Sequence, residues 1–145
     1  MASYFFKNDT ITGYIQYKTG DGHSDFSKAT TVKTPAHKTL KWTKPVAVLS
    51  NRMSYSATNS FIVRMKMAPN AIVIGDKSGG GGGLPLSSEI PNGWMVRFSA
   101  CPMYDANMQH TEWGIAPDIK VDMAAGDEAI GIDSIIEKAI EELKK

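Results

Sequence analysis

The spacing of hydrophobic residues changes along the chain and predicts an alternation of strands and helices. Short apolar runs at 46–49 and 71–74 are typical of buried, parallel strands. Between them, four apolar residues recur at helical spacing, and the polar break Pro69-Asn70 ends the helix: Ala57, Phe61, Ile62 and Met65. Strand, helix and strand in this order predict a crossover unit of an α/β fold.

The segments on either side of this unit differ in how clearly they are patterned. Residues 84–90 and 94–99 flank the turn Pro91-Asn92-Gly93 and predict a β-hairpin. The end of the chain predicts an amphipathic helix with one apolar stripe: Ile132, Ile135, Ile136, Ala139, Ile140 and Leu143. Residues 1–44 predict only one or two short strands and a long loop. Because a long structureless loop is unusual in a compact domain, this segment is either functional or separated from its packing partner.

Composition narrows the class of protein. A chain of 145 residues with 42% hydrophobic and 21% charged residues is typical of one globular domain. A formal net charge of +1 argues against nucleic acid as a partner, and no stretch is apolar enough to predict a membrane span. Lysines concentrate between Lys7 and Lys44, which favours a solvated face over a specific partner site. The single cysteine and the spacing of the three histidines predict no metal site, and the sequence predicts no cofactor.

The turn after the first buried strand is the strongest candidate site. Ligands and catalytic groups of α/β folds gather beyond the carboxyl ends of strands, where a helix N-terminus offers free N–H groups. Ser54 and Ser56 lie in this turn, and spacing alone favours an N-cap role for each over a reactive one. The chain lacks Gly-x-Ser-x-Gly, Ser-x-x-Lys and Gly-Lys-Ser/Thr motifs, which excludes α/β-hydrolases, penicillin-binding proteins and P-loop enzymes.

Two further features stay open on spacing alone. The glycine run 79–83 lies between strand patterns, so it is either a flexible connection or a tight loop beside a site. Glu112 precedes Trp113, an aromatic neighbour that could partly desolvate the carboxylate, although its spacing is that of an ordinary loop acid.

In combination, four stretches resemble the C-terminal processing (tail-specific) serine peptidases and their tricorn-core relatives. They are 45–57, 72–81, 86–94 and 112–119. A strand, a Ser-Ala helix start, a glycine-rich loop, a hairpin and a Gly-Ile-x-Pro-Asp turn rarely occur in this order by chance. The resemblance implies an α/β, crotonase/ClpP-like fold with a mixed sheet, a crossover helix and a C-terminal amphipathic helix.

The resemblance also implies roles for particular residues. Ser56 takes the place of the nucleophile, and the N–H of Ala57 that of an oxyanion donor. Gly79, Gly80 and Gly81 take the place of the substrate loop. Glu112 fits the glutamate of the tricorn-type Ser-His-Ser-Glu tetrad, and the implied substrates are peptides or unfolded proteins.

The chain departs from the family pattern at its general base. The base lysine of the tail-specific branch falls on Gly81, and Lys77 lies four residues too early. The histidine and second serine of the tetrad lie upstream of the matched region in those relatives, and Asn59 replaces a common glutamate. We therefore expect residues 45–145 to be the C-terminal part of a peptidase catalytic domain that is inactive alone, with 1–44 as a variable N-terminal segment.

Three further expectations follow. An uncovered sheet edge would pair with another copy of the chain. The resemblance points to the bacterial cell envelope, although the chain carries no targeting signal. The alternatives are a non-catalytic peptide-binding or scaffold module on the same fold and, with less support, a crotonase-like acyl-CoA enzyme.

Overall fold

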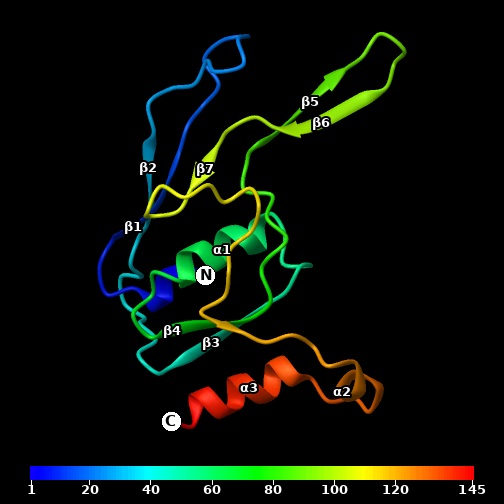
Figure 1. Cartoon of the computed structure of the whole chain (residues 1–145). Coiled ribbons are helices and arrows are strands. Elements are labelled where there is room, and N and C mark those ends of the chain that lie inside the picture. The colour runs from blue at the N-terminus through cyan, green and yellow to red at the C-terminus, as the bar shows by residue number, and fades with distance from the viewer.

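The computed structural model describes residues 1–145, which form stacked layers of sheet and helix (Figure 1). A 3₁₀ helix, η1 (Ala2–Phe5), precedes the first strands. The remaining elements are β1 (Thr10–Ile15), β2 (Thr30–Thr34), β3 (Val46–Ser50), α1 (Ala57–Met65), β4 (Ala71–Gly75), β5 (Pro85–Glu89), β6 (Met95–Ser99), β7 (Met103–Tyr104), β8 (Ile119–Lys120), α2 (Ala125–Ala129) and α3 (Ser134–Leu143).

A parallel sheet holds the crossover unit predicted from the sequence. Its strand order is β3-β4-β8, and β3 pairs with β4 in register from Val46 opposite Ala71 to Ser50 opposite Gly75. α1 connects these two strands, as the apolar spacing predicted. Because β3 pairs only with β4, its other edge is free.

The other strands form two separate antiparallel sheets. One has the order β2-β1-β7, with an irregularity between Ile11 and Gly13, and the other is the β5-β6 hairpin. The prediction of one mixed sheet is therefore wrong within this chain. α1 lies between the β1 layer and the β3-β4 layer, so its buried residues Ile62 and Met65 separate the parallel from the antiparallel strands (Figure 1).

The two faces of the parallel sheet bury different clusters because strand side chains alternate. On the α1 face, Val46 and Val48 pack against a cluster of Ala2, Phe6, Met65 and Ala68. On the opposite face, Ala47 packs against Ile74 and two residues of α3, Ile135 and Ala139. The first residues of the chain thus belong to the core, which their weak periodicity did not indicate.

Two elements leave apolar side chains exposed. α3 begins at the Asp133 cap, whose carboxylate accepts from the N–H groups of Ile135 and Ile136. Four of the six residues of the predicted stripe are 40–44% exposed: Ile132, just before the helix, and Ile136, Ile140 and Leu143. The β5-β6 hairpin extends from the body, and every residue of both strands is exposed (Figure 1). None of the helices is long and apolar enough to cross a membrane.

Candidate active site

Ser56 has a strained backbone at the start of α1. Its φ is 59° and its ψ is −114°, a region that non-glycine residues rarely adopt. The N–H of Ser56 donates to the carbonyl of Gly80 at 2.8 Å, which holds this conformation in place. Ser56 occupies the N-cap position of α1, but its side chain makes no capping hydrogen bond, so the capping role that spacing favoured for its hydroxyl is wrong. The residue is exposed to solvent.

Ser54 and Ala57, on either side of Ser56, have different roles in the turn. Ser54 accepts a hydrogen bond from the N–H of Asn51 at 3.2 Å and so stabilises the turn itself. The N–H of Ala57 donates to no group of the chain, as expected for the first turn of a helix. Since the positive end of the α1 dipole lies here, this N–H is suited to stabilise a negative oxygen beside Ser56.

The glycine run is a tight loop beside Ser56 rather than a flexible connection. The N–H of Gly79 donates to Ser54 at 3.0 Å, and that of Gly81 donates to the carbonyl of Glu112 at 2.9 Å. Gly80 and Gly81 have φ values of +83° and +77°. A Cβ at Gly80 would overlap the Glu112 carbonyl, and one at Gly81 would meet the ring of Tyr55. Both positions therefore need glycine.

Glu112 lies beside the root of the hairpin. Its Oε1 accepts from the hydroxyl of Ser99 at 2.9 Å, while its Oε2 is buried without a partner. A cleft of about 530 Å³ brings Ser56 and Glu112 together. Its lining also includes Tyr55 of the turn before α1 and residues from the glycine loop and the hairpin: Gly81, Gly83, Pro85, Arg97, Phe98 and Ser99.

Asn59, which the sequence gave no role, ties this site to the body of the protein. The side chain is fully buried on α1. Its Nδ2 donates to the carbonyl of Thr111 at 3.1 Å, and its Oδ1 accepts from Ser78 at 2.6 Å. Ser78 in turn accepts from the N–H of Ile115 at 2.7 Å. This network fixes the loops on both sides of the cleft. The one signal for it in the sequence is an amide side chain at the third residue of a helix that is buried in the core.

No side chain of the cleft lining is a histidine or a lysine. His37 stacks on Tyr4, and His110 packs edge-on against Tyr104. Lys77 is exposed, and its neighbour Asp76 has a pKa below the usual 3.8, chiefly because the backbone N–H of Lys77 donates to it and then because Arg52 lies beside it. The cleft thus contains the exposed hydroxyl of Ser56 and the carboxylate of Glu112, but no histidine or lysine that could act as a general base.

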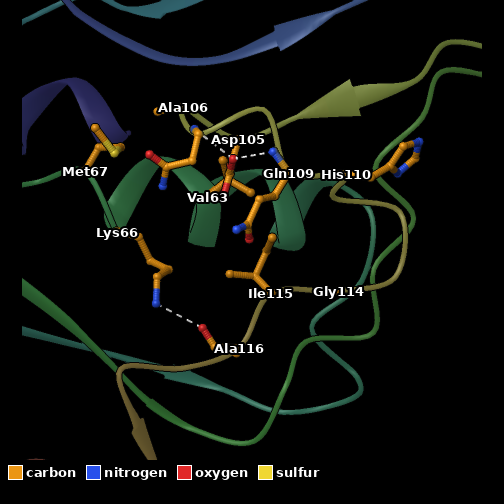
Figure 2. Close-up of a pocket in the computed structure, with 11 residues that line it drawn as sticks. Val63, Lys66, Met67, Asp105, Ala106, Gln109, His110, Gly114, Ile115 and Ala116 are labelled. Atoms are coloured by element: carbon orange, nitrogen blue, oxygen red, sulfur yellow. Dashed lines mark hydrogen bonds between the residues drawn. The ribbon is translucent and has the colours of Figure 1, made fainter.

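A second cavity, of about 270 Å³, lies beside the C-terminal end of α1, and no serine, threonine or cysteine lines it (Figure 2). Lys66 is one of its lining residues, and its ammonium group donates to the carbonyl of Ala116 at 3.0 Å and pairs with Asp118. His110 lies at the rim and points away from the cavity (Figure 2). The Ser56 cleft, by contrast, combines an exposed serine hydroxyl, a carboxylate and a free helix N–H.

Comparison with known proteins agrees with this geometry. The model of "Peptidase family S41" matches residues 1–121. The chain belongs to peptidase family S41. A crystal structure from Parabacteroides merdae, of a protein proposed to be a peptidase, is 52% identical with a TM-score of 0.93 and covers 98% of this chain and 45% of that one.

Two more distant structures share the fold of this chain. The photosystem II D1 C-terminal processing protease is 17% identical, with a TM-score of 0.56, over 83% of this chain and 29% of its own. The tricorn protease is 16% identical, with a TM-score of 0.52, over 88% of this chain and 13% of its own. The chain spans less than half the length of each of these proteins. These two comparisons show that the fold is shared.

Proposed function

We propose that this chain carries the nucleophile of a serine-type endopeptidase that cleaves peptides or unfolded proteins, and that Ser56 is that nucleophile. The observation that supports this most is the strained backbone of Ser56, which holds an uncapped, exposed hydroxyl at the N-terminus of α1 inside the cleft. Strain of this kind persists only where neighbouring contacts enforce it, and it clusters at active sites. Here the bond from Ser56 to Gly80 enforces it.

In this proposal the Ser56 oxygen attacks a peptide carbonyl and forms an acyl-enzyme, releasing the amine product. The Ala57 N–H and the dipole of α1 stabilise the carbonyl oxygen as it becomes negative. The hydroxyl proton must pass to a base and then to the leaving amine. By resemblance to the tricorn-type tetrad, that base is a histidine outside this chain. The unpartnered Oε2 of Glu112 would accept its N–H and orient the ring.

The chain alone is therefore expected not to hydrolyse peptides, since removing the base from a serine peptidase costs several orders of magnitude in rate. The test is labelling by a fluorophosphonate probe of the 145-residue chain and of the longest product of its reading frame, side by side. We expect rapid labelling of the longer product and slow or no labelling of the short chain. Ser56→Ala should abolish the signal, whereas Ser60→Ala, one turn into α1, should retain it. Labelling that survives Ser56→Ala would refute this role.

A non-catalytic peptide-binding module is the second candidate, because no histidine or lysine lines the cleft. It predicts that the longer product also fails to react with the probe, while peptides still bind to both proteins. Turnover of an unfolded substrate by the longer product, lost in Ser56→Ala, would exclude this alternative.

The proposal also covers the finer fold of the chain, its pairing with another copy and its location in the cell. We propose that residues 45–145 are the C-terminal part of a crotonase/ClpP-like catalytic domain and 1–44 its variable segment. The free edge of β3, with Leu49 43% exposed, supports pairing with another copy. A location in the bacterial cell envelope rests on the family resemblance alone.

A further inference from the structure

Arg97 lies on the wall of the Ser56 cleft that the hairpin provides. It is a residue of β6 and lines the cleft together with Ser56 and Glu112. Residues two apart on a strand share a face, so Arg97 and Ser99 point the same way. Because the Ser99 hydroxyl reaches Glu112, this face of β6 is the one that looks toward the carboxylate. Arg97 lies about 7 Å farther along the strand, the rise of two extended residues.

The charge of Arg97 is not neutralised by the chain. Its guanidinium forms no ion pair and no side-chain hydrogen bond, and the residue opposite it on β5 is Ser87. Glu89 is the nearest acid along β5, two residue pairs away opposite Met95, and it forms no ion pair with Arg97. By contrast, Arg52 is paired with Asp76 at 3.3 Å. Arg97 is thus a cation with all of its donors available, and the only lysine or arginine that lines the cleft.

We infer that Arg97 is a specificity-determining residue that binds a carboxylate of the peptide held in the Ser56 cleft. This inference rests on the proposed function, since it names the class of peptide that the same cleft prefers. A guanidinium presents paired N–H groups in a planar fork that matches a carboxylate, which an ammonium does not. The carboxylate has two possible sources, the C-terminus of the peptide or the side chain of an Asp or Glu.

The test is peptide binding to the Ser56→Ala chain, in which turnover cannot interfere, measured by fluorescence anisotropy. Three labelled peptides of one sequence are compared: the free C-terminal acid, the C-terminal amide, and the amide with one internal Asp. We expect the acid or the Asp peptide to bind about tenfold more tightly than the plain amide, as one charge-assisted hydrogen-bonded pair allows. Whichever of the two is preferred identifies the source of the carboxylate.

In Arg97→Gln the preferred peptide should bind no more tightly than the plain amide, so the ratio of the two affinities should be about one. The fold should not change, because the side chain is exposed on the hairpin. Arg97→Lys should keep only part of the preference. The matched control is Lys144→Gln, which removes one positive charge at the end of α3, far from the hairpin (Figure 1), and should keep the full ratio. Equal binding of all three peptides, or a preference that survives Arg97→Gln, overturns the inference.

Failure of this inference can be told apart from failure of the proposed function. If the probe labels Ser56 in the longer product but the binding ratio is one, the peptidase assignment stands and the role of Arg97 is wrong. If Ser56 is never labelled but the preference depends on Arg97, the cleft is that of a binding module, and Arg97 still selects its ligand.

Discussion

The hydroxyl of Ser99 lies 2.9 Å from Oε1 of Glu112, so a residue of the hairpin holds the carboxylate of the cleft. The other oxygen of Glu112 is buried and has no partner. The second oxygen of Glu112 therefore keeps an unused acceptor position for a donor that enters the cleft.

Ser99→Ala tests this link. We expect a small loss of stability, about 1 kcal/mol or less, because the bond lies at the surface. In the longest product of the reading frame, labelling of Ser56 by a fluorophosphonate should slow at least severalfold, since Glu112 is no longer held. Ser88→Ala, on the opposite face of the hairpin, should change neither quantity. Equal labelling rates for the Ser99 and Ser88 variants would contradict this prediction.

Asn59→Ala should destabilise the chain by about 2–4 kcal/mol, because it removes two buried hydrogen bonds and leaves the buried Ser78 hydroxyl without its acceptor. Urea unfolding measures the change. Asn107→Ala, at an exposed loop position, is the control and should stay close to the unaltered chain. A cost for Asn59→Ala no greater than that of the control would show that the network does not hold these loops.

The two glycines at φ +83° allow strain and close contact to be separated. Gly93 has nothing near an added Cβ, so Gly93→Ala should cost only the backbone term, about 1 kcal/mol. Gly80→Ala carries the same term and also overlaps the Glu112 carbonyl, so it should cost more and displace the Glu112 loop. Thermal melts of the two variants give the comparison, and similar melting temperatures would argue against a tight glycine loop.

The end of α3 predicts a pH dependence. The pKa of Glu142 is below its usual 4.5, chiefly through a hydrogen bond from Lys145 and then one from Lys138. The pKa of Lys138 is above its usual 10.5, through Glu141 first and Glu142 second. The stability from Glu142 is therefore present above its unfolded-state pKa and lost as the pH falls through the lowered value. That from Lys138 is present below its unfolded-state pKa and lost as the pH rises through the raised one.

Urea midpoints measured from neutral pH down to about pH 3 test the acidic side of this window. Glu142→Gln should reduce the loss of stability in acid, whereas Glu137→Gln, in the first turn of α3 and without an ion pair, should leave it nearly unchanged. The effect should be small, since these pairs lie at the surface and are screened by salt. Identical acid profiles for the two variants would exclude a contribution from this cluster.

The free edge of β3 predicts self-association. Light scattering at increasing concentration should show species larger than a monomer. Leu49→Lys, beside the free edge, should shift the protein toward the monomer, because an exposed lysine on an edge strand discourages pairing. Leu40→Lys replaces an even more exposed leucine in a loop and should have no such effect. A monomer at all concentrations would count against pairing through this edge.

The local elements could be predicted because their signals are local. The runs at 46–49 and 71–74, the helix between them and the hairpin turn each depend on residues a few positions apart, and all are present. The order of these elements, together with the Ser-Ala and Gly-Ile-x-Pro-Asp segments, was also enough to predict the family, which the comparison confirmed.

The tertiary structure decided what depends on residues far apart in the chain. Asn59 and Thr111 are 52 positions apart, and no spacing relates them before α1 packs against the loop. The burial of Phe6 follows from packing on Met65, and the separation of the sheets follows from the place of α1 between them. For Ser56, spacing alone favoured a capping role, and the family resemblance implied that of a nucleophile. The close contacts of Gly80 with Ser56 and Glu112 decide its conformation, since a backbone at positive φ needs neighbours on both sides to hold it.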